Sequence, residues 1–307
     1  MSVSPDKLIA NNLQHLIQSE LDRIGLLCRV FSRAKSVESI EKKIKKSAGK
    51  YTPDGKKIQD AFGVRVALYF PDDQAVAMDV LKNSFNYDEH SSTIDTPNGS
   101  VFTANRCNLI FKLPDEISEN STLLDSYDVL DDTFEVQIRT VLSEGWHEVE
   151  HDLRYKCQDD WSGYSDLGRA LNGIFATLET SDWGMMKLFE TLAYRHYKAG
   201  EWSQMVRTKF RLRSESDLSK EVVDKLRLYP ETGKKIFRIN REVFLSRIIK
   251  NKIELPINSD NIIYIGNYLY AGNTAILDIT PQRILRILEN SGLEQFGRAR
   301  SEAGPVR

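Results

Sequence analysis

Residues 134–156 read FEVQIRTVLSEGWHEVEHDLRYK and change from a strand-like to a helix-like pattern. At the start of this stretch every second residue is apolar, which predicts a strand whose core face carries Phe134, Val136 and Ile138. The opposite face of this strand carries three polar side chains, Glu135, Gln137 and Arg139. Apolar residues then recur at helical spacing, which predicts a helix with a buried stripe of Leu142, Trp146, Val149 and Leu153.

Two further strands with one polar face are predicted upstream. The first follows Asp60, and its alternating apolar residues leave Arg65 on the open face. The second, over 106–113, places Arg106 and Asn108 on the open face, and Asn98-Gly99 before it predicts a hairpin turn. Helices are predicted from Pro5 onward and over 73–84. Together these elements predict an α+β fold, a mixed β-sheet with flanking helices and an open polar face.

The C-terminal half is predicted to be mainly helical. After Leu167, apolar residues at helical spacing are expected to form core, and they are Leu167, Leu171, Ile174, Phe175, Leu178, Met185, Met186, Phe189 and Leu192. We therefore expect a sheet domain with a helical extension over residues 1–213. A small helical domain is expected over 214–290, and a flexible tail over 291–307.

The composition is that of an ordinary soluble globular protein, with 41% hydrophobic and 28% charged residues. A formal net charge of −2 predicts no general attraction to nucleic acid or to a membrane. No segment approaches the length of an apolar membrane span. Three widely spaced cysteines, Cys28, Cys107 and Cys157, indicate neither a disulfide framework nor a zinc site, so a cytoplasmic location is expected.

A basic segment lies between the first predicted helix and the first predicted strand. It has seven lysines and one acid between Lys42 and Lys57, and such a run is often only a solvated helix face. Here, however, a guanidinium, two ammonium groups and a hydroxyl occur on or just before one helix face, on Arg33, Lys35, Ser39 and Lys43. That combination suits the binding of a polyphosphate.

Two acids, Asp60 and Glu135, lie at the starts of predicted strands whose open faces also carry cations. Mg²⁺ uses one or two carboxylates together with phosphate oxygens. Phosphoryl transfer needs mainly positioning and charge neutralisation. Asp60 and Glu135 therefore predict a site for Mg²⁺ with a nucleoside triphosphate.

Four segments, in this order, resemble the synthetase domain of the RelA/SpoT family, the alarmone synthetases. They are RxKxxxSIxxK from Arg33, DxxGxRV from Asp60, ExQIRT from Glu135 and W…EHxxxYK from Trp146. The resemblance covers roughly residues 21–156 and does not include the C-terminal half. It implies a nucleotidyltransferase-like fold. It also implies a pyrophosphokinase that transfers the β,γ-pyrophosphate of ATP to the 3′-hydroxyl of GDP or GTP, which gives the stringent-response alarmone (p)ppGpp.

The resemblance also implies roles for the matched residues on the ATP side. Arg33 and Arg65 would sandwich the adenine ring. Lys35, Ser39 and Lys43 would hold the ATP phosphates.

For catalysis, the resemblance implies that Asp60 and Glu135 bind Mg²⁺. Glu135 would also draw the proton from the acceptor hydroxyl. Gln137 and Arg139 would support the site.

One motif of the family is absent. The family normally has a segment DYI…PKxxGYxSxH, whose tyrosine stacks on guanine, whereas residues 92–113 read STIDTPNGSVFTANRCNLIFKL. The acceptor side is instead expected to consist of Arg106, Asn108, His151 and Lys156. The acceptor therefore stays open between GDP or GTP and the 3′ end of tRNA, which some toxin members of the family modify. Basic surface for tRNA could come from 42–57 or from 207–213, and a homo-oligomer is also left open.

Two other classes of protein remain as alternatives. Residues 147–151 spell HExxH, the motif of zinc proteases, with Glu179 as a candidate third ligand. A non-catalytic binder of nucleotides or RNA is the other alternative. The presence of both Asp60 and Glu135 argues against it, because two carboxylates repel each other without a metal.

Overall fold

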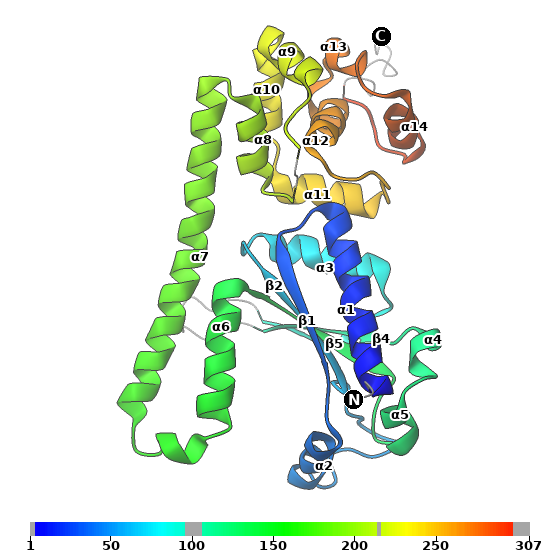
Figure 1. Ribbon diagram of the computed structural model, residues 1–307, viewed down its shortest axis with the longest axis vertical. Helices are drawn as coiled ribbons and strands as arrows, with labels where there is room; N and C mark the ends of the chain where they lie inside the picture. The colour runs from blue at the N-terminus through cyan, green and yellow to red at the C-terminus, as the bar shows by residue number, and fades with distance from the viewer. Residues whose placement is uncertain (1–3, 96–105, 214–215, 297–307) are drawn as a thin grey trace, which may run out of the picture. The chain divides into compact units, whose positions relative to one another are not determined.

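The computed structural model of the chain describes residues 4–95, 106–213 and 216–296 (Figure 1). Two compact units make up the chain. Unit 1 consists of Met1–Glu20, Cys28–Gln74 and Leu81–Trp183, and unit 2 of Leu21–Leu27, Ala75–Val80 and Gly184–Arg307. The predicted turn at Asn98-Gly99, the predicted boundary at residue 214 and residues 297–307 of the predicted tail lie outside the described residues.

Unit 1 contains the predicted mixed sheet, and this sheet has five strands. The strands are β1 (Cys28–Ala34), β2 (Phe62–Leu68), β3 (Tyr87–Ile94), β4 (Cys107–Lys112) and β5 (Thr133–Thr140). Their order in the sheet is β1-β2-β5-β4-β3. Only β2 and β5 run parallel, and the other neighbouring strands are antiparallel. Strand β1 was not predicted, although Cys28 and Val30 alternate with polar residues and are buried.

One face of the sheet forms the core of unit 1. Alternating strand residues are almost fully buried there, and they include Val64, Val66, Leu109, Phe111, Phe134 and Val136. Helix α1 (Pro5–Ile24) supplies a further buried stripe, and its Gln14 accepts a hydrogen bond from Ser32 of β1 at 2.9 Å. Because successive strand residues point to opposite faces, this burial leaves the polar residues on the other face, as predicted.

The remaining elements of unit 1 connect the strands or follow β5. They are α2 (Val37–Lys46), α3 (Asp73–Ser84, whose middle belongs to unit 2), α4 (Asp115–Ser118), α5 (Thr122–Ser126), α6 (Val141–Glu150), a π-helix (His151–Tyr155), a 3₁₀-helix (Gln158–Trp161) and the first part of α7 (Ser165–Ala199). The stripe predicted after β5 is only partly correct. Trp146 is buried and packs on Phe175, but Val149 is 49% and Leu153 62% exposed. The change from α-helix to π-helix at His151 interrupts the helical spacing that the prediction assumed.

The prediction that the apolar residues along α7 form buried core is also mostly wrong. Among its nine residues only Phe175 is buried, whereas Leu167 and Ile174 are more than half exposed. Helix α7 contains the division between the two units at residues 183 and 184. The predicted division into a domain over residues 1–213 and a small domain over 214–290 stays a prediction.

Unit 2 is helical, which confirms the predicted C-terminal helical region. Its elements after α7 are α8 (Trp202–Phe210), α9 (Lys220–Leu228), α10 (Pro230–Phe237), α11 (Arg241–Lys250), α12 (Ser259–Gly266), a π-helix (Asn267–Ala271), α13 (Thr274–Leu277) and α14 (Gln282–Asn290). Its core includes Phe210 and Phe244, whose rings lie 5.4 Å apart. No helix in the described part of the chain is both long enough and apolar enough to cross a membrane.

Candidate nucleotide-binding site

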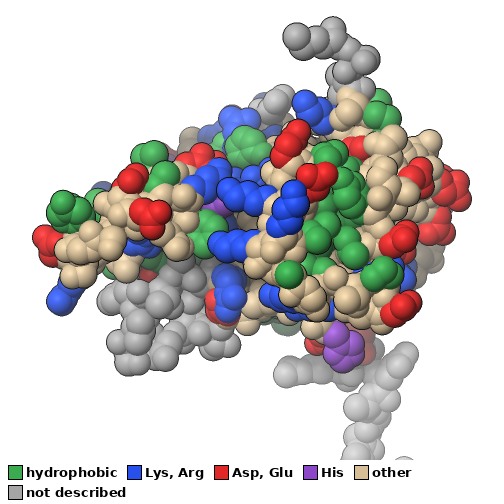
Figure 2. Space-filling model, turned by 90° about the horizontal axis from the view of Figure 1, so that it is seen from below, with side chains coloured by type: hydrophobic (Ala, Val, Ile, Leu, Met, Phe, Trp, Pro, Cys, Tyr) green, Lys and Arg blue, Asp and Glu red, His purple; other side chains and the backbone are tan. Residues whose placement is uncertain are grey.

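The open face of the sheet in unit 1 bears a cavity of about 760 Å³. Ten of the thirteen residues predicted for the site line it: Arg33, Lys35, Ser39, Lys43, Asp60, Arg65, Glu135, Gln137, His151 and Lys156. Eight further residues complete the lining: Phe31, Ser32, Lys42, Lys46, Ser47, Gly63, Val64 and Tyr155. Lys and Arg side chains gather near the centre of the face seen in Figure 2. Segments that are far apart in the sequence therefore converge on one basic cavity.

The register of the strands explains this convergence. Arg33 of β1 pairs with Gly63 of β2, which in turn pairs with Glu135 of β5. The row two residues along consists of Phe31, Arg65 and Gln137. Both rows lie on the same face because residues two apart in a strand point the same way. A Cβ added at Gly63 would have no described atom within 4 Å, so this glycine leaves the floor of the cavity open.

Asp60 precedes β2 and is held by two lysines. Lys35 Nζ lies 2.6 Å from Asp60 Oδ2, and Lys43 Nζ lies 2.8 Å from Asp60 Oδ1. Burial of the Asp60 carboxyl group opposes its ionisation, but the two ammonium groups outweigh burial and hold its pKa below the ordinary value. Burial lowers the pKa of Lys35 although Asp60 opposes this. These two lysines balance the charge of Asp60, so the presence of Asp60 and Glu135 in one cavity does not by itself require a metal.

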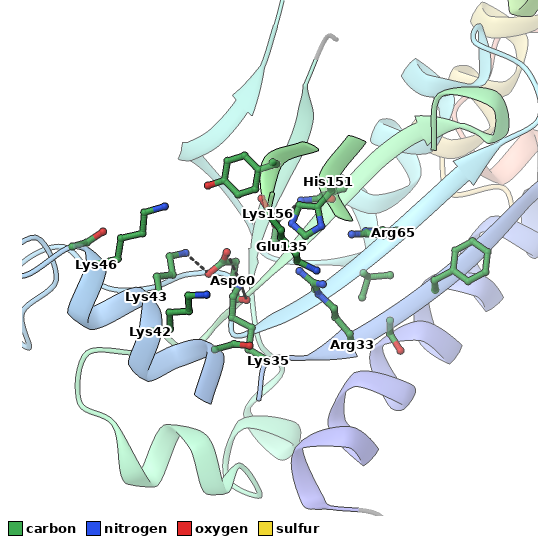
Figure 3. Close-up of a pocket in the computed structure, with 18 residues that line it drawn as sticks. Arg33, Lys35, Lys42, Lys43, Lys46, Asp60, Arg65, Glu135, His151 and Lys156 are labelled. Carbon is green, nitrogen blue, oxygen red and sulfur yellow. Dashed lines mark hydrogen bonds and ion pairs between the residues drawn. The ribbon is translucent and has the colours of Figure 1, made fainter. Parts of the chain in front are cut away.

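Helix α2 brings a hydroxyl and several ammonium groups to the cavity. Its N-cap is Ser36, whose side chain accepts a hydrogen bond from the backbone N of Ser39 at 3.3 Å. Residues four apart share a helix face, so this start places Ser39 and Lys43 together, as predicted. Lys42 and Lys46 also reach the cavity. Figure 3 shows Lys42, Lys43 and Lys46 on one side of Asp60 and Glu135, and Arg33 and Arg65 on the other.

Glu135 is fixed by two side-chain amides. Asn108 Nδ2 donates to Glu135 Oε1 and Gln137 Nε2 donates to Glu135 Oε2, each at 2.9 Å. Asn108 thus touches the carboxylate without lining the cavity itself. These two bonds hold the Glu135 carboxylate in a fixed orientation and leave further oxygen lone pairs for a cation or a proton.

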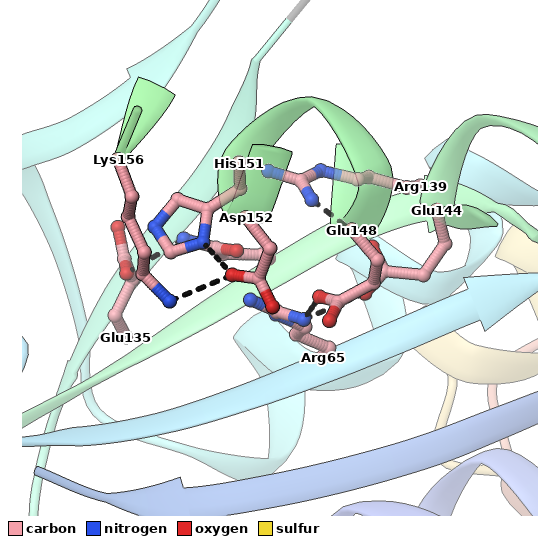
Figure 4. A network of polar contacts seen from close by, with 9 residues as sticks. Arg65, Glu135, Arg139, Glu144, Glu148, His151, Asp152 and Lys156 are labelled. Atoms are coloured by element: carbon pink, nitrogen blue, oxygen red, sulfur yellow. Dashed lines mark hydrogen bonds and ion pairs between the residues drawn. The ribbon is translucent and has the colours of Figure 1, made fainter. Parts of the chain in front are cut away.

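Glu144 was not predicted, yet it connects two of the predicted arginines (Figure 4). Its Oε1 accepts from Arg65 Nη1 and its Oε2 accepts from Arg139 Nη1, each at 3.0 Å. Arg65 also pairs with the more exposed Glu148. Arg139 lies behind the cavity rather than in its lining. The sequence signal was an acid in the first turn of the helix that follows a strand with an arginine next to its last residue.

The HExxH segment does not form a zinc site among the described residues. The ring of His147 packs against Trp146 and Phe175, with centroids 5.2 and 5.8 Å away. Burial, and then the charges of Arg139 and Arg65, lower the pKa of His147 to about 4. No three His, Cys, Asp or Glu side chains in the described ranges are grouped to hold a metal ion. The sequence match with zinc proteases therefore has no structural counterpart here.

The π-helix that follows α6 forms one rim of the cavity. Asp152 Oδ1 lies 3.0 Å from His151 Nδ1 and 2.6 Å from Lys156 Nζ (Figure 4). Tyr155 stacks against His151 and is 55% exposed. His151 and Lys156, which were predicted for the acceptor side, are therefore at the cavity, where the carboxylate of Asp152 joins them.

Arg106 is not where the prediction placed it. Its guanidinium forms two hydrogen bonds with Asp95, Nε to Oδ2 at 2.9 Å and Nη2 to Oδ1 at 3.0 Å. The Arg106 side chain is 64% exposed and lies outside the cavity lining. Arg106 precedes β4 and pairs with the residue that follows β3, which draws it to the strand ends instead of the sheet face.

The second basic stretch, residues 207–213, is also different from its prediction. Arg207 pairs with Asp217, and Arg213 with Asp22 at 3.2 Å. Lys209 lies over the ring of Phe237, and Arg211 is only 6% exposed. These side chains are therefore engaged by ion pairs and packing within unit 2, and a role of this stretch in binding RNA phosphates stays a prediction.

The composition of the cavity favours an anionic ligand. Its lining has seven Lys and Arg side chains but only two carboxylates, Asp60 and Glu135. The ammonium groups suit phosphates and the guanidinium planes can stack on a base. Two carboxylates beside phosphate-binding lysines also match the ligands that Mg²⁺ uses.

Comparisons with known proteins agree with the predicted resemblance. Residues 32–160 match a family model described as "Region found in RelA / SpoT proteins". Similar solved structures include small alarmone synthetase 2 from Bacillus subtilis, with 23% identity, 58% of this chain and 89% of that chain covered, and a TM-score of 0.44. Another is smu.1046c from Streptococcus mutans UA159, with 20% identity, 60% and 91% covered, and a TM-score of 0.47. No curated protein matches the chain.

Proposed function

We propose, on the premise that residues 32–160 are a RelA/SpoT region, that this protein is a nucleotide pyrophosphokinase. It transfers the β,γ-pyrophosphate of ATP to the 3′-hydroxyl of GDP or GTP and so produces (p)ppGpp. The observation that carries the proposal is the single cavity in which seven cationic side chains surround Asp60 and Glu135.

On the donor side, Arg33 and Arg65 stack on adenine. Lys35, Ser39 and Lys43 bind the ATP phosphates, which compete with Asp60 for the two ammonium groups. This exchange frees the Asp60 carboxylate when ATP enters.

Asp60 and Glu135 would hold Mg²⁺, which would neutralise charge on the phosphates. Glu135 also accepts the proton of the acceptor 3′-hydroxyl. The oxygen then bonds to the β-phosphorus while the bond between that phosphorus and the α,β-bridging oxygen breaks and AMP leaves. Asn108 and Gln137 keep the Glu135 carboxylate aimed during this step.

The deciding experiment incubates the protein with γ-labelled ATP and Mg²⁺, and with GDP, GTP or bulk tRNA in separate reactions. Label in ppGpp or pppGpp is expected. Label in tRNA alone would replace the guanosine nucleotide by the tRNA 3′ end as acceptor. No label in any product would mean a non-catalytic nucleotide binder.

A further inference from the structure

An exposed aromatic side chain stands in the lining of the cavity without an assigned role. Tyr155 is the last residue of the π-helix and keeps 55% of its surface exposed. The ring of His151 lies nearly parallel to it, at 12° and with centroids 5.7 Å apart. This is an offset stack, which braces the tyrosine ring and leaves much of its surface open. π-Helical turns occur frequently at functional sites.

Two lysines of the cavity lining are close to this ring in space or in sequence. Lys46 Nζ lies 5.9 Å from the centroid of Tyr155, and Lys156 is the next residue along the chain. Both lysines line the same cavity. An aromatic face combined with adjacent cations is the arrangement that binds a base and its phosphates without strong base preference.

The ring lies beside a lysine that is across the carboxylates from the proposed adenine site. That lysine is Lys46, and Figure 3 shows it on the other side of Asp60 and Glu135 from Arg33 and Arg65. One base between the two arginines would therefore leave the tyrosine free for a second base. A transfer between two nucleotides needs two base sites on either side of the reacting phosphates.

We infer that Tyr155, braced by His151, is the surface on which the base of the acceptor nucleotide stacks. The inference rests on the proposed function, because it names the residue that recognises the acceptor. The ligand is a purine nucleoside with a free 3′-hydroxyl and phosphate on its 5′ side. Both a free guanosine nucleotide and the terminal adenosine of tRNA have this chemistry.

The test compares three variants of the full chain. Tyr155→Phe keeps the ring and Tyr155→Ala removes it. The matched control is Tyr164→Ala, because Tyr164 is 57% exposed and lies outside the described lining of the cavity. For each variant, KM is measured for ATP, GDP, GTP and bulk tRNA, and GDP binding is measured by calorimetry without ATP.

Tyr155→Ala is expected to raise KM for the acceptor by on the order of ten- to a hundredfold, the effect of losing one stacked base. KM for ATP should change less than about twofold. Tyr155→Phe and Tyr164→Ala should have KM values close to those of the wild type, both for the acceptor and for ATP. The rise occurs in the GDP and GTP reactions if the source is a free nucleotide, and in the tRNA reaction if it is tRNA.

Other results overturn the inference. An unchanged acceptor KM in Tyr155→Ala, or a rise in KM for ATP alone, removes Tyr155 from the acceptor site while the proposed function stands. If the wild type modifies no acceptor, the proposed function fails and calorimetry decides about Tyr155. GDP binding that only Tyr155→Ala weakens then supports a base site, whereas GDP binding that is absent or unaffected excludes it.

Discussion

Glu144 and Arg65 form a hydrogen-bonded ion pair, with Glu144 Oε1 3.0 Å from Arg65 Nη1. The second oxygen of the same carboxylate accepts from Arg139, and only 12% of the Glu144 side chain is exposed. One carboxylate therefore orients two guanidinium groups, of which only Arg65 reaches the cavity. Glu144 is a positioning residue, since it acts on a ligand through Arg65.

Glu144→Ala should lower the free energy of unfolding by roughly 3 kcal/mol, because it leaves two arginines partly buried without their shared partner. It should also raise KM for ATP. Glu148→Ala is the control, because Glu148 also pairs with Arg65 but is 51% exposed, so its loss should cost less than about 1 kcal/mol. Urea unfolding measures the free energy of unfolding of both variants. Equal losses of stability would show that the buried carboxylate of Glu144 contributes no more than the exposed one of Glu148.

Asp60→Asn and Glu135→Gln should each reduce pyrophosphate transfer by about 100-fold or more, because each replaces a carboxylate that is proposed to bind Mg²⁺. The amides have nearly the same size, so circular dichroism should match the wild type. Transfer is measured over a range of Mg²⁺ concentrations. Near-normal turnover of either variant at saturating Mg²⁺ would contradict the proposed metal ligands.

Arg33→Ala and Arg65→Ala should both weaken ATP binding more than acceptor binding, because both guanidinium groups are assigned to adenine. Only Arg65→Ala should also lower the melting temperature, since it removes one partner of the buried Glu144 carboxylate. Calorimetry with a non-hydrolysable ATP analogue and thermal unfolding separate these two effects. Loss of acceptor affinity alone would move Arg65 to the other base site.

Gly63 offers a test in which stability and binding should change in opposite directions. An added Cβ meets open space at this position, and a glycine inside a strand costs about 0.5–1 kcal/mol relative to alanine. Gly63→Ala and Gly63→Val should therefore be as stable as the wild type or more so, while ATP binding falls with side-chain size. The series is measured by urea unfolding and calorimetry, and unaltered ATP affinity in Gly63→Val would exclude this floor from the ATP site.

His147 should make the fold sensitive to mild acid. Its folded-state pKa of about 4 lies below the ordinary value of 6.5, so the unfolded chain binds the proton first as the pH falls. Stability from His147 is complete above about pH 6.5 and is lost progressively toward pH 4. His147→Phe keeps a ring against Trp146 and should remove this loss, worth on the order of 1–2 kcal/mol between pH 7 and pH 5.

Urea unfolding of the wild type and of His147→Phe at these two pH values provides the measurement. A pH of 5 stays above the range in which Asp60, with its lowered pKa, would begin to titrate. An equal loss in both proteins would place the acid sensitivity elsewhere.

Local patterns in the sequence predicted much of the sheet and most of the cavity. The alternation around Phe134 and the motifs around Arg33, Asp60 and Glu135 consist of residues that are close together in the sequence. The register of the strands then brings these segments to one face of the sheet. Glu144 could not be predicted in its role, because an acid in a first helical turn is ordinary. Its significance comes from Arg65, which is 79 positions away.

Predictions that required tertiary context were less successful. Arg106 fits the open face by alternation, but Asp95 at the end of the neighbouring strand binds it more directly. Leu153 fits a helical stripe, but the π-helix at His151 rotates the following residues away from the buried face. Neither the ion pair with Asp95 nor the π-helix at His151 can be predicted from the spacing of apolar residues.

The division of the chain into units has a consequence for its synthesis. Every residue that lines the cavity lies between positions 31 and 156, yet Leu21–Leu27 and Ala75–Val80 belong to the unit that Gly184–Arg307 completes. On the ribosome, Ile24 and Leu26, both fully buried in the folded chain, are synthesised well before the residues from Gly184 onward that belong to the same unit. A chain that stops after the cavity sequence therefore lacks most of unit 2, and we expect it to depend on chaperones more than the full chain does.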